Sequence, residues 1–186
     1  NSVTVTSINN TSTGVIKADA TTGGRAYGIN MSSAASVGTL INAGLISGSA
    51  VSALGHGIHL TESSNIETLT NSGRILGVAG LSRGTGLFAS KSTITTLTNT
   101  GTISGSADST MGVGLKLKTA SIITLTNNGL ISGSATTNDA VGIYVNDNSV
   151  ITSLTNTSTI RAQGKGYAYG VNVGSGTIQT INNSGI

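Results

Sequence analysis

Polar and apolar residues alternate along short stretches of the chain, which is the pattern of a β-strand with one buried face. Between Leu69 and Gly77 the odd positions hold Leu, Asn, Gly, Ile and Gly, and the even positions hold Thr, Ser, Arg and Leu. We expect the odd set to face inward. No stretch shows a sustained helical spacing of apolar residues with capping residues at its ends. The pattern therefore predicts an all-β chain.

The alternating stretches belong to a phrase that recurs along the chain. An aliphatic residue is followed by Asn, Gly and Ile at intervals of two positions. Clear copies begin at Leu40, Leu69, Leu97 and Leu125, a copy at Leu154 has Ser158 in the place of Gly, and further copies begin at Ile181 and, with about two extra residues, at Ile8. Such self-similarity at a fixed spacing is the signature of a repeat protein.

Two further markers keep the same period. A Gly followed by an aliphatic residue, any residue and a second aliphatic residue occurs at Gly28, Gly57, Gly86, Gly114, Gly142 and Gly170. A third apolar position, three residues before the first marker, holds Val37, Ile66, Ile94, Ile122, Ile151 and Ile178. Successive glycines of the second series are 28 or 29 residues apart throughout. Three markers with one period indicate one repeating structural unit.

A repeat of this length leaves no room for crossover helices, since a parallel pair otherwise needs a connection of about a dozen residues or more. A coil that passes once around a three-sided cross-section allows each strand to pair with its equivalent one coil later, at about 4.8 Å. We therefore expect a right-handed parallel β-helix, a three-sided solenoid of about six coils of 28–29 residues that forms a single domain over residues 1–186.

The repeated Asn would lie inside this solenoid, where an unpaired buried amide costs about 1–3 kcal/mol. Stacked on identical residues, each amide can bond the Asn above and below it and a backbone group of a turn. We therefore expect a structural Asn ladder at one corner, made of Asn42, Asn71, Asn99, Asn127, Asn156 and Asn183. The glycines beside it should supply positive φ or close approach at corners. The Ser-Gly-Ser-Ala copies at 47–50, 104–107 and 132–135 should form turns between faces.

Composition changes the picture mainly by exclusion. Of the 186 residues only 8% are charged and 3% are aromatic, and Pro, Cys and Trp are absent. Without Cys there are no disulfides, thiolate metal sites or cysteine catalysis. No apolar run approaches the roughly 18 residues of a membrane helix, so we expect no membrane insertion of this segment. A net charge of +3 is only weak evidence for nucleic-acid binding, and we do not expect nucleic acid as a partner.

The Leu-x-Asn-x-Gly-x-Ile phrase, with its Ser- and Thr-rich connections, resembles the β-helical passenger region of type V autotransporters over the whole chain. The Asn ladder is also similar to those of pectate-lyase-like β-helices. Autotransporter membership would imply export across a Gram-negative outer membrane and an extracellular or cell-surface location. It would also imply adhesion to host cells, surfaces or other bacteria, or self-association between passengers. Such passengers lie between a signal peptide and a C-terminal barrel, so we expect a longer chain of which these residues are a fragment.

Candidate catalytic groups are few, and we expect no enzyme and no cofactor. The six acidic residues share no equivalent coil position, which argues against the clustered carboxylates of a polysaccharide-cleaving enzyme, the disfavoured alternative; they are Asp19, Glu62, Glu67, Asp108, Asp139 and Asp147. A released effector or toxin-like ligand of a host receptor is the main alternative to an adhesin.

A metal site at the two histidines is not expected either. His56 and His59 are three residues apart, so regular alternation would place them on opposite faces of a strand, with His56 packed and His59 exposed. Two histidines on opposite faces cannot share one metal ion.

One set of outward residues could form a binding strip. The position two residues after each second-series Gly holds Asn30, His59, Phe88, Lys116, Tyr144 and Asn172. If the coils stack in register, Phe88, Lys116 and Tyr144 become neighbours, with Lys118 two residues along and His59 one coil before. This aromatic and cationic strip would suit a host-cell receptor or glycan. Ordinary cross-strand packing is the alternative explanation.

Overall fold

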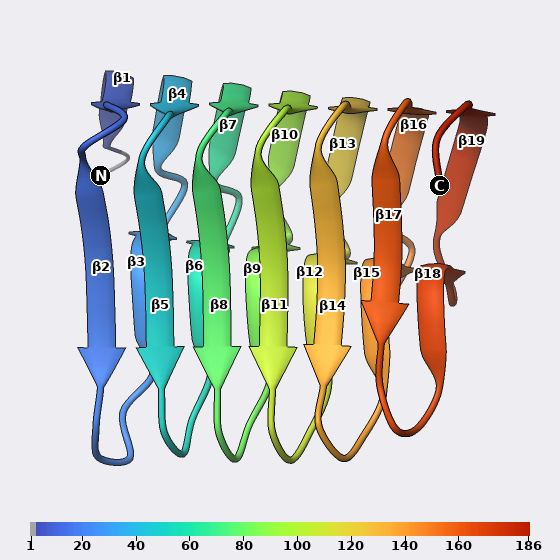
Figure 1. The fold of residues 1–186 in the computed structure, drawn as a ribbon. Coiled ribbons are helices and arrows are strands. Elements are labelled where there is room, and N and C mark those ends of the chain that lie inside the picture. The colour runs from blue at the N-terminus through green and yellow to red at the C-terminus, as the bar shows by residue number, and fades with distance from the viewer. Residues whose placement is uncertain (1–2) are drawn as a thin grey trace.

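The computed structural model describes residues 3–186, which form nineteen strands wound into a solenoid (Figure 1). Sheet A consists of β1 (Thr4–Asn10), β4 (Ser36–Asn42), β7 (Asn65–Asn71), β10 (Thr93–Asn99), β13 (Ser121–Asn127), β16 (Val150–Asn156) and β19 (Thr177–Asn183). Sheet B consists of β2 (Val15–Ala20), β5 (Leu45–Ala50), β8 (Arg74–Ala79), β11 (Thr102–Ala107), β14 (Leu130–Ala135) and β17 (Thr159–Gln163). Sheet C consists of β3 (Ala26–Met31), β6 (Gly55–Leu60), β9 (Gly84–Ser90), β12 (Gly112–Lys118), β15 (Ala140–Asn146) and β18 (Ala168–Val173).

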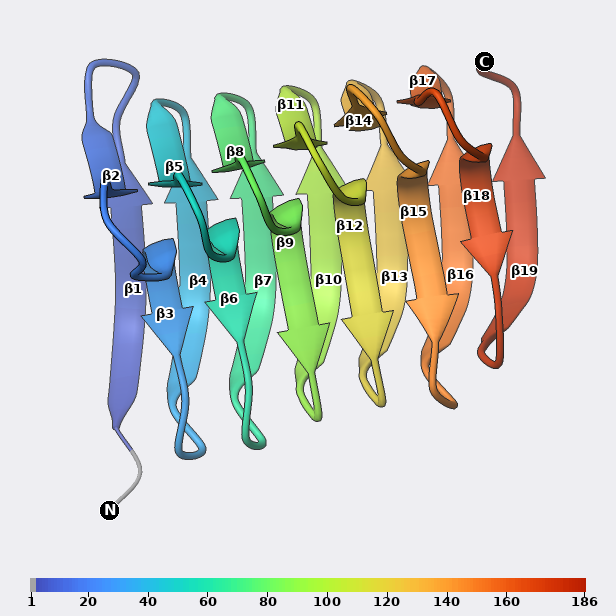
Figure 2. The same ribbon diagram turned by 90° about the horizontal axis from the view of Figure 1, so that it is seen from below.

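Each strand pairs in parallel with its equivalent one coil earlier and one coil later, as the repeat predicts. Leu69, for example, pairs with Leu40 on one side and Leu97 on the other. Figures 1 and 2 show the chain advancing from coil to coil in a right-handed sense. The predicted three-sided solenoid of about six coils is confirmed.

Between Gly28 and Gly142, the corner between sheets C and A accounts for the change of period from 29 to 28 residues. Four residues separate Leu60 from Asn65, whereas three separate the equivalent residues Ala89 and Thr93. The longer corner has two residues with left-handed backbone, Glu62 and Ser63, and the shorter one has only Lys91. The strands on either side of this corner keep their register because the corner absorbs the extra residue.

The Asn ladder is confirmed and contains one more rung than expected. Each side-chain amide donates to the Oδ1 of the Asn one coil later, and the series starts at Asn10, whose Nδ2 lies 2.7 Å from Asn42 Oδ1. The same amides reach backbone carbonyls just past the corner, as Asn99 does at Leu130, 3.1 Å away. These hydrogen bonds offset the cost of burying the amides.

The corner glycines serve close approach and not positive φ. A Cβ at Gly73 would collide with the Gly44 carbonyl of the preceding coil. Among residues 3–186 only one glycine, Gly23, has a left-handed backbone, at a φ of 41°. The other left-handed residues lie at the corner between sheets C and A and are not glycines.

The Ser-Gly-Ser-Ala copies do not form turns, contrary to the expectation. They lie within β5, β11 and β14. A Cβ at Gly48 would collide with the backbone carbonyl of His56 in sheet C. Small residues occur in sheet B because sheet C packs directly against it here, backbone to backbone.

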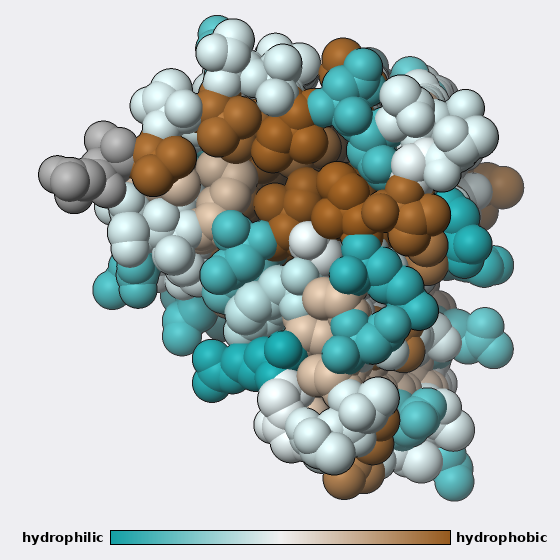
Figure 3. Space-filling view, turned by 90° about the vertical axis from the view of Figure 1, so that its left-hand side faces the viewer, coloured by the Kyte–Doolittle hydropathy of each residue, from teal (hydrophilic) through white to brown (hydrophobic). Residues whose placement is uncertain are grey.

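Apolar side chains that would lie between coils are uncovered at the two ends of the rod. Figure 3 looks onto the N-terminal end, where apolar residues are surrounded by hydrophilic ones. Val5, which shares the inward column of Val37 and Ile66, is 36% exposed there, and Ile181 is 56% exposed at the other end. A hollow of about 250 Å³ between Leu154, Val171 and Ile186 marks the C-terminal end of the core.

Candidate functional site

The strip lies on the outer face of sheet C, with its members in the expected order. Lys116 on β12 pairs directly with Phe88 on β9 and with Tyr144 on β15. The Lys116 Nζ lies 4.9 Å from the centroid of the Tyr144 ring, which is a cation–π distance. In-register stacking therefore places a cation between two aromatic rings.

Aromatic contacts extend the strip toward the N-terminal end of the rod. His59 on β6 stacks on Phe88 at 5.3 Å between centroids and on Tyr27 of β3 at 4.2 Å. Its Nδ1 lies 2.8 Å from the Asn30 Oδ1. The sequence analysis did not place Tyr27 beside His59. Tyr27 lies one residue before its repeat glycine, Gly28, whereas His59 lies two residues after the equivalent Gly57.

The two histidines lie on the same side of sheet C, so the expectation of opposite faces was wrong. The centroids of the His56 and His59 rings are 5.0 Å apart. In the ladder between β3 and β6, Tyr27 pairs with His56 and Ile29 with Ile58, and the glycine between them is passed over. A Cβ at Gly57 would lie 2.7 Å from the Ile75 Cγ2 of sheet B, so Gly57 faces inward as its neighbour Ile58 does. Two successive inward residues break the alternation, as in a β-bulge.

This irregularity gives sheet C a second outward column directly beside the strip. The column contains Tyr27, His56, Thr85, Val113, Val141 and Tyr169. His56 is only 2% exposed, packed as expected, and the centroid of its ring lies 5.2 Å from that of Phe88. His59, by contrast, is half-buried and not fully exposed. The strip and the second column therefore form one packed outer layer.

Positive charge accumulates in this layer without matching negative charge. Lys116 is only 7% exposed, and burial, with the neighbouring charges of Arg83 and Lys118, lowers its pKa to about 8. Asp147 acts in the opposite direction, and it lies 3.8 Å from the Lys118 Nζ. Burial is thus the largest cause of the shift, and two of the three charged neighbours are cations.

The two histidines are kept neutral by the same surroundings. Burial lowers the pKa of His56 to about 3, helped by His59, Arg83, Lys116 and Arg25. Burial and Arg25 lower the pKa of His59 to about 4. Both imidazoles are therefore uncharged at neutral pH, and the charge of the layer comes from its Lys and Arg side chains.

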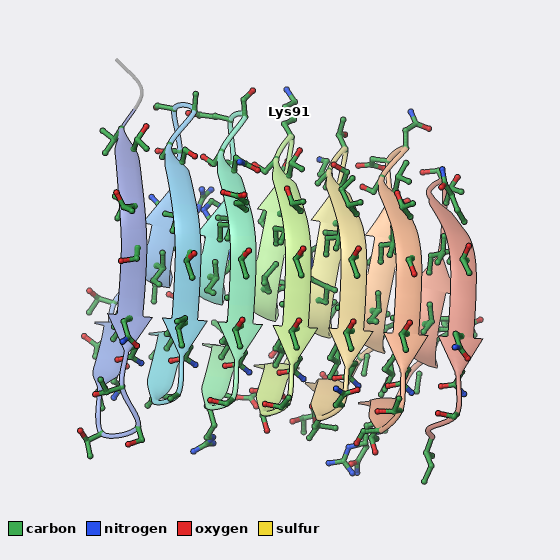
Figure 4. The ribbon with its side chains drawn as sticks, turned by 90° about the horizontal axis from the view of Figure 1, so that it is seen from above. Lys91 is labelled. Carbon is green, nitrogen blue, oxygen red and sulfur yellow. The ribbon has the colours of Figure 1, made fainter. Side chains whose placement is uncertain are left out.

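A shallow hollow at the corner between sheets C and A adjoins the strip. Its volume is about 510 Å³, and its walls come from four successive coils: Ser63, Ser64 and Asn65; Lys91, Ser92 and Thr93; Thr119, Ala120 and Ser121; Asn148 and Val150. The two middle coils have the shorter corner, so the hollow lies between the longer corners of the flanking coils. Figure 4 shows Lys91 projecting outward from this corner.

The strip and the hollow meet at Lys118, the last residue of β12, which precedes Thr119 in the wall of the hollow. Hydroxyl and amide groups dominate the hollow, whereas rings and cations dominate the strip. Sequence reasoning missed the hollow, although the change of spacing from 29 to 28 residues was its signal.

No three His, Cys, Asp or Glu side chains of residues 3–186 gather as metal ligands would. The same residues include no helix of the length and apolar character that crossing a membrane requires.

Comparison with known proteins adds no relative. The chain matches no protein-family model, no curated protein and no solved structure. Its assignment as a parallel β-solenoid therefore rests on its own strand pairing and its Asn ladder.

Proposed function

We propose that this β-solenoid is a non-enzymatic adhesive segment of an exported bacterial protein, of the type V autotransporter passenger kind. It acts outside a Gram-negative cell, on the surface or after release, in binding to host cells, surfaces or other bacteria. The outer layer of sheet C is its binding face.

The observation that carries this proposal is the continuous series of ring and cation contacts across successive coils. It runs from Tyr27 through His59 and Phe88, and Lys116 joins Tyr144 one coil further on. Tyr and Phe comprise only five residues of this chain, four Tyr and one Phe, and three of them lie in this series. Aromatic and cationic side chains are also those that dominate the energy of binding surfaces.

The test is adhesion by bacteria that display the chain, with Phe88→Ser and Tyr144→Ser combined in one variant. Adhesion should fall about tenfold or more, as for loss of aromatic hot-spot residues. The control combines Ile41→Ser and Ile123→Ser, which remove two exposed apolar side chains from sheet A. Equal adhesion by both variants, with unchanged melting temperatures, would argue against the proposed binding face.

Two other functions make different predictions. A released ligand of a host receptor would be found in the culture medium and not with the cells, which a fractionation blot would show. A polysaccharide-acting enzyme would shorten a glycan polymer, which a depolymerisation assay would detect.

A further inference from the structure

The ligand class follows from the charge and the unpartnered groups of the same face, so this inference rests on the proposed function. We propose that the outer layer of sheet C binds an acidic polysaccharide. Its carboxylate or sulfate groups lie beside Arg83 and Lys116, and its sugar rings lie against Phe88 and Tyr144.

The first argument is the imbalance of charge. Arg83, Lys116 and Arg25 all act on His56, and all three are cations. The one acidic neighbour of Lys116, Asp147, lies closer to the end of the strip, beside Lys118. An anion bound between Arg83 and Lys116 would therefore supply the negative charge that no side chain of the protein places there.

The second argument is the position of the unsatisfied polar atoms. Buried side-chain nitrogen and oxygen atoms normally have hydrogen-bond partners. In residues 3–186 the buried atoms without one are both ring nitrogens of His56, Arg83 Nε, Thr85 Oγ1 and Thr110 Oγ1. All of them lie on or just before three successive strands, β6, β9 and β12. Arg83 and Thr110 are partly exposed residues whose donors a small side-chain rotation would turn toward an anion, whereas Thr85 is fully buried. No other strands of the described chain have such unpartnered atoms.

The third argument distinguishes a polymer from a simple anion. Phe88 and Tyr144 flank Lys116 on the two neighbouring strands, so the two rings are two strand spacings apart, about 10 Å. The layer then continues along the rod axis through His59 to Tyr27. An extended chain of sugar rings with acidic groups fits such a row, in which aromatic rings lie on both sides of the Lys116 ammonium.

Calorimetric titration of the intact chain tests the ligand class. Heparin supplies sulfate groups, polygalacturonate supplies carboxylates, and neutral dextran, inorganic sulfate and single-stranded DNA are the comparison ligands. We expect heparin or polygalacturonate to bind, more weakly as salt is raised, and dextran not to bind. Which of the two binds more tightly identifies the acidic group.

Charge-removing variants locate the site. Arg83→Gln and Lys116→Gln should each weaken binding of the acidic polymer about tenfold or more, as for a lost charge-assisted contact. The matched control, Arg74→Gln, removes an exposed charge from sheet B and should change the affinity less than about twofold. Circular dichroism and melting temperature verify that each variant folds.

Several outcomes would overturn the inference. These are no binding of either acidic polymer, an equal effect of Arg74→Gln, tighter binding of single-stranded DNA, or inorganic sulfate binding as tightly as the polymers. If the Phe88 and Tyr144 variant loses cell adhesion but neither acidic polymer competes with adhesion, the ligand class is wrong and the adhesive function stands. If the protein binds an acidic polymer but bacteria that display it do not adhere to cells, the ligand class is supported and the proposed adhesive function is wrong.

Discussion

At the scale of single residues, His56 departs most clearly from its equivalents in other coils. Val113 and Val141 occupy the same column and bury only apolar atoms. His56 buries an imidazole with both nitrogens unpartnered, which costs free energy of folding. A buried neutral histidine also makes stability depend on pH, because protonation is far easier in the unfolded chain.

We therefore expect the protein to lose stability as the pH falls. The folded pKa of His56 is about 3 and the unfolded value is 6.5, so between these pH values the unfolded chain takes up a proton that the folded chain does not. The full shift corresponds to at most about 5 kcal/mol at pH 3. Melting temperature as a function of pH checks this, with His56→Val as the comparison. The melting temperature of the valine variant should fall less steeply as the pH is lowered. An equally steep fall in both proteins would contradict the assignment of this pH dependence to His56.

The Asn ladder predicts a dependence on position within the rod. Asn99→Ala removes two ladder bonds and leaves buried groups of its neighbours unpaired, so we expect a loss of about 2–4 kcal/mol in the free energy of unfolding. Asn183→Ala is the matched control, since Asn183 is exposed and accepts one ladder bond. It should cost less than about 1.5 kcal/mol. Denaturant unfolding compares the two, and equal losses would contradict a ladder that depends on burial.

At the scale of the strands, the sequence predicts the repeat well and its irregularities poorly. The apolar markers, Leu69 and Ile66 among them, predict the strands of sheet A because burial on one face requires period two. The Ser-Gly-Ser-Ala segments looked like turns because Gly and Ser are common in turns. Their place in sheet B depends on the close packing of sheet C, which no local pattern encodes.

The same limit applies to the candidate site. The strip could be predicted because its members share one marker position, and the structure brings Phe88, Lys116 and Tyr144 together as expected. Tyr27, Arg83 and Thr85 could not be placed beside it. Their approach depends on the bulge at the second-series glycine, where the regular alternation of faces fails.

Gly57 tests the importance of that bulge. A Cβ there would lie 2.6 Å from the Gly86 carbonyl oxygen and 2.9 Å from the Leu76 nitrogen, so Gly57→Ala should destabilise the fold by about 1–3 kcal/mol. Gly24→Ala is the control, because the nearest atom would be 3.6 Å from its Cβ. Thermal or denaturant unfolding measures both. A neutral Gly57→Ala would show that sheets B and C can move apart there at little cost.

At the scale of the whole molecule, each coil depends mainly on the coils next to it, so stability should be nearly additive along the rod. Deleting residues 100–127 removes one period and joins Asn99 to the chain where Asn127 was, which keeps every following side chain on its own face. We expect a folded β-rod whose denaturant m-value is lower by roughly 15%, in proportion to its length.

The control deletion removes residues 97–123, one residue fewer, and leaves the extra residue within a strand of sheet A, where no corner can absorb it. The residues of that strand after the junction then shift by one position, which exchanges their inward and outward faces. Circular dichroism and the cooperativity of unfolding distinguish the two deletions. The second should fail to give a cooperative transition, and two equally cooperative proteins would contradict strict register.

The ladder also gives the molecule a polarity that its symmetric appearance conceals. All six ladder bonds point the same way, with the amide nitrogen of one coil donating to the amide oxygen of the next. Within residues 3–186, Asn10 Oδ1 therefore has no rung donor, and Asn183 Nδ2 has no rung acceptor. Any coil that extends this column can join it in one orientation only. Two identical ends could not continue the ladder, because two amide oxygens or two amide N–H groups would then face each other.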